Sequence, residues 1–333
     1  MNKNPKSTAV QYDIEVNEQR CTKCGLCEAF CPVNVFELDE VGDKKDVVVA
    51  HPELCWGCET CVGQCPHNAL RVSCDNAVDP FLDAEKALPL DEEKKAEYAS
   101  WAQTLKEILG LRWEPVAISL IKEGDPLPDV PVPSERMRYC QSLMAARRGR
   151  SFMLPANRHA CPDGTSILGL TDIPEKLASG ELYILFHKLD SVEAAQQMVR
   201  ERPMLEPYTT AATVTTPLND AKCEVEVVAV VAEPEQIMWL CMSAAYYTGH
   251  RWDFKASGYN AQCVETTLLP LTTDQPNISF GCYGCRASSD VGDNLMFMGI
   301  PVSLMPTVIK GLNELGKKAI PQSRSKVYLP PLP

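Results

Sequence analysis

Eight cysteines in the first quarter of the chain form two runs with the same internal spacing. The two runs are Cys21, Cys24, Cys27 and Cys31, and then Cys55, Cys58, Cys61 and Cys65. A proline follows the fourth cysteine of each run, so both read C-x2-C-x2-C-x3-C-P. Thiolate is the soft ligand that iron–sulfur clusters require, and this spacing is typical of proteins that hold two [4Fe-4S] clusters. The two runs therefore predict iron–sulfur chemistry and electron transfer.

The fourth cysteine of each run predicts how the two clusters share their ligands. Three cysteines wrap one corner of a cubane, and the fourth, set apart by its proline, reaches the other cluster. We expect one cluster on Cys21, Cys24, Cys27 and Cys65, and the second on Cys55, Cys58, Cys61 and Cys31. Two zinc sites or a disulfide framework are the alternatives, although zinc usually takes pairs of ligands separated by a longer spacer.

The two runs resemble the two-cluster bacterial ferredoxin family over roughly residues 10–75. Gly25 and Gly57 suit a backbone that folds closely around inorganic sulfide. The segment between the runs, residues 33–54, alternates apolar and polar residues and predicts a hairpin somewhat longer than a minimal ferredoxin needs.

The length of the chain, 333 residues, favours two domains of unequal size. We expect an α+β protein with a small ferredoxin-like domain at residues 1–75 and a larger mixed α/β domain at residues 100–327. Residues 76–99 would form a linker and the start of a helix, and residues 328–333 an extended tail.

The elements expected in the larger domain alternate between helices and strands. Strands are predicted at residues 116–121, 182–186 and 225–231. Helices are predicted at residues 91–109, 139–148, 174–179, 191–200, 234–247 and 307–315. The sheet topology does not follow from these positions.

Five cysteines of the larger domain lie in polar or glycine-rich text or at the start of an expected helix: Cys140, Cys161, Cys263, Cys282 and Cys285. Cys282 and Cys285 form a CxxC in GCYGCR, and Cys161 lies in NRHACPDGTSILG. Four of the five could hold a third iron–sulfur cluster or a zinc ion, and the alternative is a group of reduced thiols. By contrast, Cys74, Cys223 and Cys241 are expected to serve in packing.

A second resemblance involves the same region. The segments RMRYCQSLMAARRGR, NRHACPDGTSILGL and NAQCVETTLLP, with SFGCYGCRASSDVGDNLMFMGIP, are similar to the uncharacterised family called domain of unknown function 169. The resemblance covers about residues 100–327 and supplies no activity. It implies that this part of the chain is one domain and that the five cysteines lie in segments that recur in the family.

His159, Arg147 and Arg148 are the candidate catalytic residues near these cysteines. His159 lies two residues before Cys161 and could donate a proton to a reduced substrate, or lie on the surface of a loop. Arg147 and Arg148, with Arg150, could grip a carboxylate or phosphate, although basic residues at a helix end also complement its dipole. The chain carries no GxGxxG before a helix, no P-loop and no GxSxG, and no readable signature of a flavin.

The charge of the chain is concentrated near its beginning. The net charge is −12, and residues 1–130 hold 24 acidic and 13 basic side chains. Such a surface could steer a basic redox partner or only keep the domain soluble, and it does not resemble a nucleic-acid footprint. No apolar run is long enough to span a membrane, and no signal peptide is apparent. Sixteen cysteines in such a chain predict a cytoplasmic, anaerobic protein.

These features favour an iron–sulfur oxidoreductase. Its two [4Fe-4S] clusters would take single electrons from a soluble carrier or partner protein. They would pass them to the cysteine-lined site, which would hold a third cluster or a small-molecule substrate. The alternative is a non-catalytic electron-transfer or redox-sensing subunit that docks on a larger enzyme.

Overall fold

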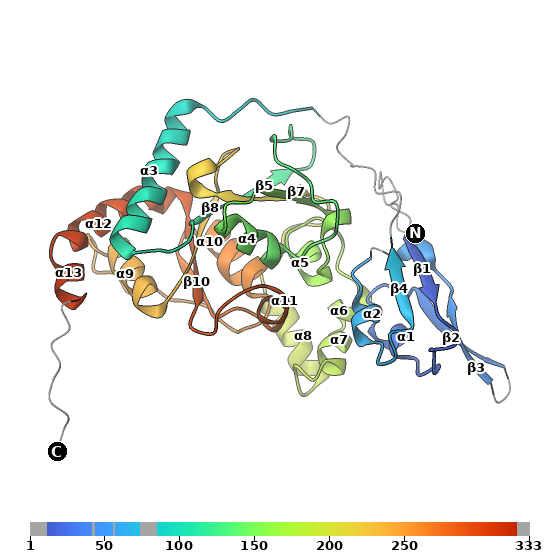
Figure 1. The fold of residues 1–333 in the computed structure, drawn as a ribbon. Coiled ribbons are helices and arrows are strands. Elements are labelled where there is room, and N and C mark those ends of the chain that lie inside the picture. Colours follow the sequence, from blue (N-terminus) through green and yellow to red (C-terminus); the bar gives the residue numbers. More distant parts are fainter. Residues whose placement is uncertain (1–11, 42–43, 56, 74–84, 325–333) are drawn as a thin grey trace, which may run out of the picture.

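The computed structural model describes residues 12–41, 44–55, 57–73 and 85–324. These residues form a small N-terminal domain and a larger C-terminal domain (Figure 1). The small domain has paired short strands and two short helices, and the large one has an antiparallel sheet between helices. This architecture is α+β, as the sequence predicts. Within the described ranges, no helix is long and apolar enough to cross a membrane.

The N-terminal domain places its two cysteine runs on matching loops and helices. Its elements are β1 (Asp13–Val16), α1 (Leu26–Phe30), β2 (Phe36–Val41), β3 (Lys44–Val49), η1 (Pro52–Leu54), α2 (Thr60–Gln64) and β4 (Leu70–Ser73). Strand β1 pairs antiparallel with β4, and β2 pairs antiparallel with β3. The β2–β3 pair is the hairpin expected between the runs. Each cysteine run ends at a short helix, α1 or α2.

Two glycines allow the cysteine loops to turn tightly. Gly25 has φ +77°, and a Cβ there would lie 2.6 Å from Cδ1 of Leu38. Gly57 has φ +65°, and a Cβ there would lie 2.5 Å from both Tyr12 and Arg136. An L side chain would be strained at these angles and would collide with its neighbours. Glycine is therefore needed in both loops for conformation and for space.

Six strands form the sheet of the C-terminal domain. They are β5 (Val116–Lys122), β6 (Phe152–Pro155), β7 (Thr210–Pro217), β8 (Val227–Ala232), β9 (Asn277–Ser279) and β10 (Met296–Pro301). Their order is β6-β7-β5-β8-β10-β9, and all neighbours are antiparallel. The sequence did not predict β6, β7, β9 or β10.

Helices cover both faces of this sheet. They are α3 (Glu92–Leu109), α4 (Tyr139–Arg147), α5 (Pro162–Ile167), α6 (Glu175–Ala178), α7 (Glu181–Leu185), α8 (Val192–Glu201), α9 (Pro234–Ala244), α10 (Leu269–Thr273), α11 (Tyr283–Ser288), α12 (Met305–Lys317) and α13 (Ala319–Arg324). Shorter turns are η2 (Ala156–Arg158), η3 (Leu218–Asp220) and η5 (Val302–Leu304), and η4 (Ala261–Leu268) is a π-helix.

Alternate residues of the central strand β8 serve two separate cores. Val228 and Val230 belong to the core shared with α3, α9 and α12. Val227, Ala229 and Val231 belong to the core shared with α4, α5 and η4. Successive side chains of a strand point to opposite faces of its sheet, which explains this division. The five cysteines of interest lie on the side of α4, α5 and η4.

The helices expected from the sequence are present, and one expected strand is wrong. The stretch 182–186, predicted as a strand, lies in helix α7 and at its end. Five apolar residues in a row fit a short strand or a buried helical turn equally well. Here Leu182 and Tyr183 pack in one cluster with Phe30 of the N-terminal domain, so tertiary packing favours the helix. Cys74, residues 76–84 of the expected linker and the expected tail at residues 328–333 lie outside the described residues.

Candidate functional site

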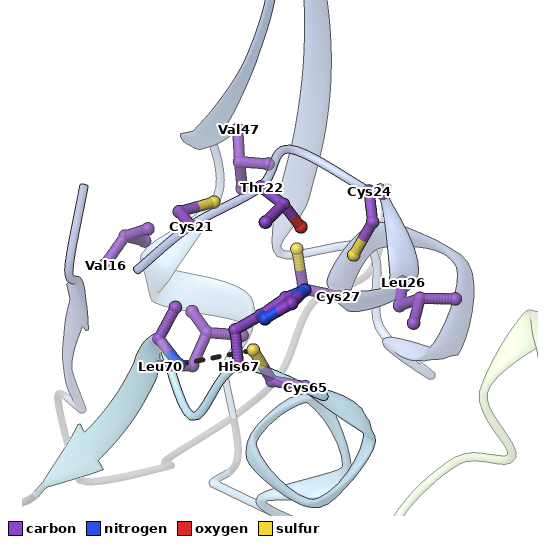
Figure 2. A pocket seen from close by; sticks show the side chains of 12 residues that line it. Val16, Cys21, Thr22, Cys24, Leu26, Cys27, Val47, Cys65, His67 and Leu70 are labelled. Atoms are coloured by element: carbon purple, nitrogen blue, oxygen red, sulfur yellow. Dashed lines mark hydrogen bonds between the residues drawn. The ribbon is translucent and has the colours of Figure 1, made fainter. Parts of the chain in front are cut away.

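Four cysteines of the N-terminal domain line one pocket. They are Cys21, Cys24, Cys27 and Cys65, and Figure 2 shows their sulfur atoms directed toward a common space. Val16, Val47 and Leu70 form apolar walls around this space. Cys65 comes from the second run, so the pocket contains the set of thiols that the spacing assigns to one cluster.

The other four cysteines line a second pocket. They are Cys31, Cys55, Cys58 and Cys61, and the walls include Ile14, Phe36 and Val72. Cys31 comes from the first run, so the two runs exchange their fourth cysteine. Both pockets have mainly apolar surroundings, which suit a buried inorganic cluster held by soft thiolates.

Backbone N–H groups are directed at the thiols in the same way in both runs. The N–H of Val35 donates to Sγ of Cys31 at 3.3 Å, and the N–H of Ala69 donates to Sγ of Cys65 at 3.3 Å. Each bond joins a cysteine to the residue four positions later. Such bonds stabilise negative charge on sulfur and tune the potential of a cluster. The two halves of the domain therefore place Cys31 and Cys65 in equivalent surroundings.

Burial opposes ionisation of these thiols in the protein alone. It raises the pKa of Cys27 and Cys55 to about 11 and that of Cys61 to about 12. A thiol that coordinates a metal is deprotonated, because the positive charge of the metal offsets this cost. The chemistry of these residues therefore fits iron–sulfur ligation.

The five cysteines of the C-terminal domain come together from distant segments. Cys140 lies in the first turn of α4, Cys161 precedes α5 and Cys263 lies in η4. Cys282 precedes α11, and Cys285 lies within it. Cys140, Cys263, Cys282 and Cys285 pack in one hydrophobic cluster, and Cys161 begins α5, whose Gly164 lies beside Sγ of Cys263. The fold therefore gathers the five thiols that the sequence singles out.

The thiols of this group have different acidities. The hydrogen bond from Cys285, together with the charge of Arg138, lowers the pKa of Cys140 to about 6 despite its burial. The same hydrogen bond, followed by burial, raises the pKa of Cys285. Burial raises the pKa of Cys161 to about 12 and also raises that of Cys263. Cys140 is thus the thiol that ionises most readily.

His159 lies next to these cysteines, as expected from its place in the sequence. Its Nδ1 accepts a hydrogen bond from the N–H of Cys161 at 3.3 Å, and its ring stacks on Tyr139 with centroids 6.4 Å apart. Burial, and then the charge of Arg138, lowers the pKa of His159 to about 4. The imidazole is therefore neutral near pH 7, and its Nε2 has no hydrogen-bond partner among the described residues.

A glycine separates His159 from Cys263. A Cβ at Gly164 would lie 2.7 Å from Cε1 of His159 and 3.2 Å from Sγ of Cys263. The imidazole and this thiol therefore flank one backbone position in the first turn of α5. The lack of a side chain at Gly164 is what lets them approach each other.

The structure does not bring Arg147 and Arg148 to the cysteines. They lie at the other end of α4, where their guanidinium carbons are 6.0 Å and 5.7 Å from the ring centroid of Trp113. Arg148 also pairs with Asp290. Arg147 follows Cys140 by seven positions, which is about 10 Å along a helix. These arginines therefore form a stacked group around Trp113.

Sequence reasoning missed two arginines that do approach the thiols. Arg138 affects the pKa of Cys140, Cys161 and His159, and its guanidinium lies beside Gly284 of the CxxC loop. Arg136 lies beside Gly57 and within range of the charge of Cys55. The signal in the sequence is their position, two and four residues before Cys140.

Arg136 also belongs to the contact between the two domains. Its Nη2 lies 3.0 Å from Oε1 of Glu59, and Nζ of Lys176 donates to the carbonyl of Glu28 at 2.6 Å. The rings of Phe30 and Phe186 pack with centroids 4.9 Å apart. Polar and apolar contacts thus hold the pocket of Cys31 and Cys55 against the larger domain.

Among the described residues, no three His, Cys, Asp or Glu side chains gather closely enough to hold a single metal ion. Cys241 and Cys223, expected to pack, lie half-buried against separate hydrophobic clusters. Cys241 and Cys223 thus differ from the cysteines of the two pockets and of the five-thiol group, because each packs in a separate apolar cluster.

Comparison with known families agrees with this division of the chain. Residues 20–69 match the family described as the 4Fe-4S dicluster domain, so the N-terminal domain is an iron–sulfur domain of the ferredoxin type. Residues 104–311 match DUF169, which is described as an uncharacterised ArCR. The chain belongs to this family.

Individual relatives cover different shares of the chain. An uncharacterized protein of Methanocaldococcus jannaschii is 25% identical over 214 residues, which are 63% of this chain and 91% of that protein. A ferredoxin of Methanothermococcus thermolithotrophicus is 39% identical over 59 residues, 18% of this chain and 92% of the ferredoxin. An archaeal glutamate synthase (NADPH) of Archaeoglobus fulgidus is 37% identical over 62 residues, and the match spans 19% of this chain and only 12% of that enzyme. No solved structure matches the chain.

Proposed function

We propose that the protein is an oxidoreductase that passes single electrons from two [4Fe-4S] clusters to a redox centre in its C-terminal domain. Cys21, Cys24, Cys27 and Cys65 would hold one cluster, and Cys31, Cys55, Cys58 and Cys61 the other. The redox centre would be the group formed by Cys140, Cys161, Cys263, Cys282 and Cys285. The packing of Cys140, Cys263, Cys282 and Cys285 in one cluster, with Cys161 at the start of the adjoining helix α5, is the observation that carries the proposal.

A short stretch of chain supports the route between the centres. Arg136 lies beside the pocket of Cys55, while Arg138 acts on Cys140. Met137, between them, forms a parallel bridge with His159. Two residues of extended chain span about 7 Å, so one short segment carries a side chain toward each of the two sites.

The roles of the remaining parts follow from their positions. The cluster of Cys21 would receive the electron, because the pocket of Cys31 and Cys55 includes Glu59, which pairs with Arg136 of the other domain. The donor would be a soluble carrier or a partner protein, and the acidic residues before position 130 would attract a basic one. His159 would exchange a proton with the thiols or with a small-molecule substrate. The many cysteines fit a reducing cytoplasm in an anaerobic cell.

A second candidate function is that of a subunit that docks on a larger enzyme. Helix α9 and the turn after it expose four large side chains at helical spacing: Met238, Met242, Tyr246 and Tyr247. An exposed apolar group of this kind is typical of surfaces that bind other proteins. A subunit would require its partner for turnover, whereas an oxidoreductase would not.

Iron and acid-labile sulfide analysis of the reconstituted chain tests the proposal. About eight irons would restrict clusters to the N-terminal domain, and about twelve would place a third cluster on the C-terminal cysteines. Anaerobic redox titration then compares the natural chain with the double variant Cys282→Ser, Cys285→Ser. The double variant should lose all redox capacity beyond that of the N-terminal clusters.

The matched control is Cys241→Ser, because Cys241 lies half-buried in α9, in the other core. The proposal fails if the double variant keeps its full iron content and takes up as many electrons as the natural chain. Reduction of an acceptor by the isolated chain would separate the oxidoreductase from the docking subunit.

A further inference from the structure

Three arginines surround one half-buried tryptophan at the end of α4. Their guanidinium carbons lie 5.0 Å (Arg112), 6.0 Å (Arg147) and 5.7 Å (Arg148) from the ring centroid of Trp113. The N–H of Glu114 donates to the carbonyl of Arg147 at 2.9 Å, which holds the segment after α3 against the end of α4. Because like charges repel, such a group destabilises the fold unless an opposite charge offsets it.

Arg147 is buried without a counter-charge. The residue is only 7% exposed, and its Nε has no hydrogen-bond partner among the described residues. Burial, followed by the charges of Arg148 and Arg112, lowers the pKa of Arg147 to about 10. Buried arginines are normally paired, because a charge that leaves water unpaired destabilises the fold strongly. Trp113 compensates only in part, since Arg147 lies at the outer limit of a cation–π contact.

The acidic side chains at this place are paired with other cations. Glu114 pairs with Lys106, and Asp290 pairs with Arg148. In the part of the chain that the structure describes, no ion pair involves Arg112 or Arg147. The group therefore keeps an excess of positive charge on these two arginines.

The end of the helix does not account for this excess. Basic side chains near a helix C-terminus often bind its last carbonyls and complement its dipole. Here backbone N–H groups already bind three of these carbonyls, those of Ala145, Ala146 and Arg147. The arginines are therefore not needed as caps, and their charges are available to a ligand.

We propose that Arg112, Arg147 and Trp113, with Arg148 at the edge, form a binding site for a phosphate group, either inorganic phosphate or the phosphate of a small molecule. Arg112 and Arg147 together offer two positive charges. A phosphate group carries about −1.5 to −2 at pH 7, whereas a carboxylate carries a single charge. Charge balance therefore favours phosphate, and guanidinium groups bind its oxygens in a bidentate manner.

The site is open to solvent and separate from the redox centre. Arg112, Arg148 and Gly149 are exposed, and nothing lies within 4 Å of a Cβ at Gly149. Cys140 lies in the first turn of α4, at the other end of the helix from these arginines. The inference thus goes beyond the proposed function, and each can fail without the other.

Isothermal titration calorimetry of the full-length chain with its clusters, at constant ionic strength, is the first test. Inorganic phosphate or glycerol 3-phosphate should bind once per chain, and acetate about tenfold more weakly because it has a single charge. Tighter binding of glycerol 3-phosphate would identify a phosphorylated small molecule as the ligand, and tighter binding of inorganic phosphate the free anion. Absence of binding by both, or equally tight binding of acetate, would overturn the inference.

Arg112→Gln is the variant that tests the residues. It removes one unpaired charge from an exposed side chain, so the fold should be preserved and phosphate binding weakened about tenfold. Arg200→Gln is the matched control, because it removes the same charge from an exposed position in α8 and should bind phosphate like the natural chain. Unchanged phosphate binding by Arg112→Gln would overturn the inference.

Arg147→Met tests the buried charge by anaerobic thermal unfolding. An apolar side chain of similar length removes the unpaired charge, so the variant should unfold at the same temperature as the natural chain or higher without phosphate. Added phosphate should raise the unfolding temperature of the natural chain by mass action and leave that of the variant unchanged. An equal rise in both chains would overturn the inference, and Arg112→Gln decides the matter if Arg147→Met does not fold.

Discussion

The two cysteine regions of this protein reach a thiol-lined site by different routes. In the N-terminal domain, short loops and the helices α1 and α2 supply all eight thiols within residues 21–65. In the C-terminal domain, five thiols between residues 140 and 285 come from α4, α11, η4 and the start of α5. The first site depends on local turns, while the second depends on the complete sheet and its helices.

This difference determines what each site tolerates. The N-terminal thiols are arranged by backbone N–H donors and by Gly25 and Gly57 within the loops themselves. The C-terminal thiols depend on close packing far away in the sequence, such as the approach of β10 to η4 at Gly299. A substitution that disturbs packing should therefore damage the C-terminal thiol group and spare the N-terminal pockets. A substitution of a cysteine in an N-terminal pocket should do the reverse.

The largest effect is expected for Cys61→Ser. Serine lacks the soft sulfur that a cluster prefers, so the variant should lose about four of its irons. Iron and sulfide analysis measures this loss, and thermal unfolding checks the C-terminal domain, which should be unaffected. Cys223→Ser, at a half-buried cysteine outside both pockets, is the control. Retention of all iron would contradict the ligand assignment.

Gly299→Ala should produce the opposite pattern. A Cβ at Gly299 would collide with the carbonyl oxygen of Thr266 in η4, so the helix carrying Cys263 must move. Overpacking of this kind costs about 1–3 kcal/mol of stability. Alkylation of Cys263 should become faster, while the iron content of the N-terminal domain stays the same.

Gly63→Ala is the matched control, because nothing lies within 4 Å of a Cβ at that position. It should leave both sites intact, since alanine also favours helix α2. If Gly299→Ala lost N-terminal iron as well, the two sites would not be independent, and the comparison would fail.

The same contrast explains what could be predicted from the sequence. The cysteine sets of the N-terminal pockets match the sets predicted from the spacing: local turns group three cysteines of each run, and the fourth comes from the other run. Cys140 and Cys285 were both singled out by the residues around them, but their packing in one cluster requires the tertiary fold and has no signal in the sequence. Strand β7 was missed because almost all its residues are buried, so its pattern does not alternate.

A smaller effect is expected for Arg136→Gln at the contact between the domains. The positive charge of Arg136 lies within range of Cys55, and removing it should lower the reduction potential of that cluster. The shift should be on the order of tens of millivolts, as expected for one charge near a cluster. Spectroelectrochemical titration measures it.

Glu59→Gln is the control for the ion pair itself. Glu59 is exposed, and its 3.0 Å contact with Arg136 would lose its ionic character in both variants. Only the Glu59 side chain of this pair is exposed, so Glu59→Gln should change the unfolding temperature little, whereas the buried Arg136 side chain also loses packing when it is replaced. A lowered potential in Glu59→Gln as well would assign the effect to the domain contact instead of to the charge.

The smallest effect is expected for Arg138→Gln. It distinguishes Arg138, just before α4, from Arg148 at the end of that helix. The hydrogen bond from Cys285 is the main cause of the lowered pKa of Cys140, about 6, and the charge of Arg138 adds to it. Arg138→Gln should therefore raise this pKa and reduce the thiolate fraction, slowing alkylation of Cys140 about threefold near pH 6. Arg148→Gln should leave the rate unchanged, because Arg148 stacks on Trp113 and pairs with Asp290. Equal slowing by both variants would show that the summed charge of the arginines, and not Arg138 alone, controls the thiol.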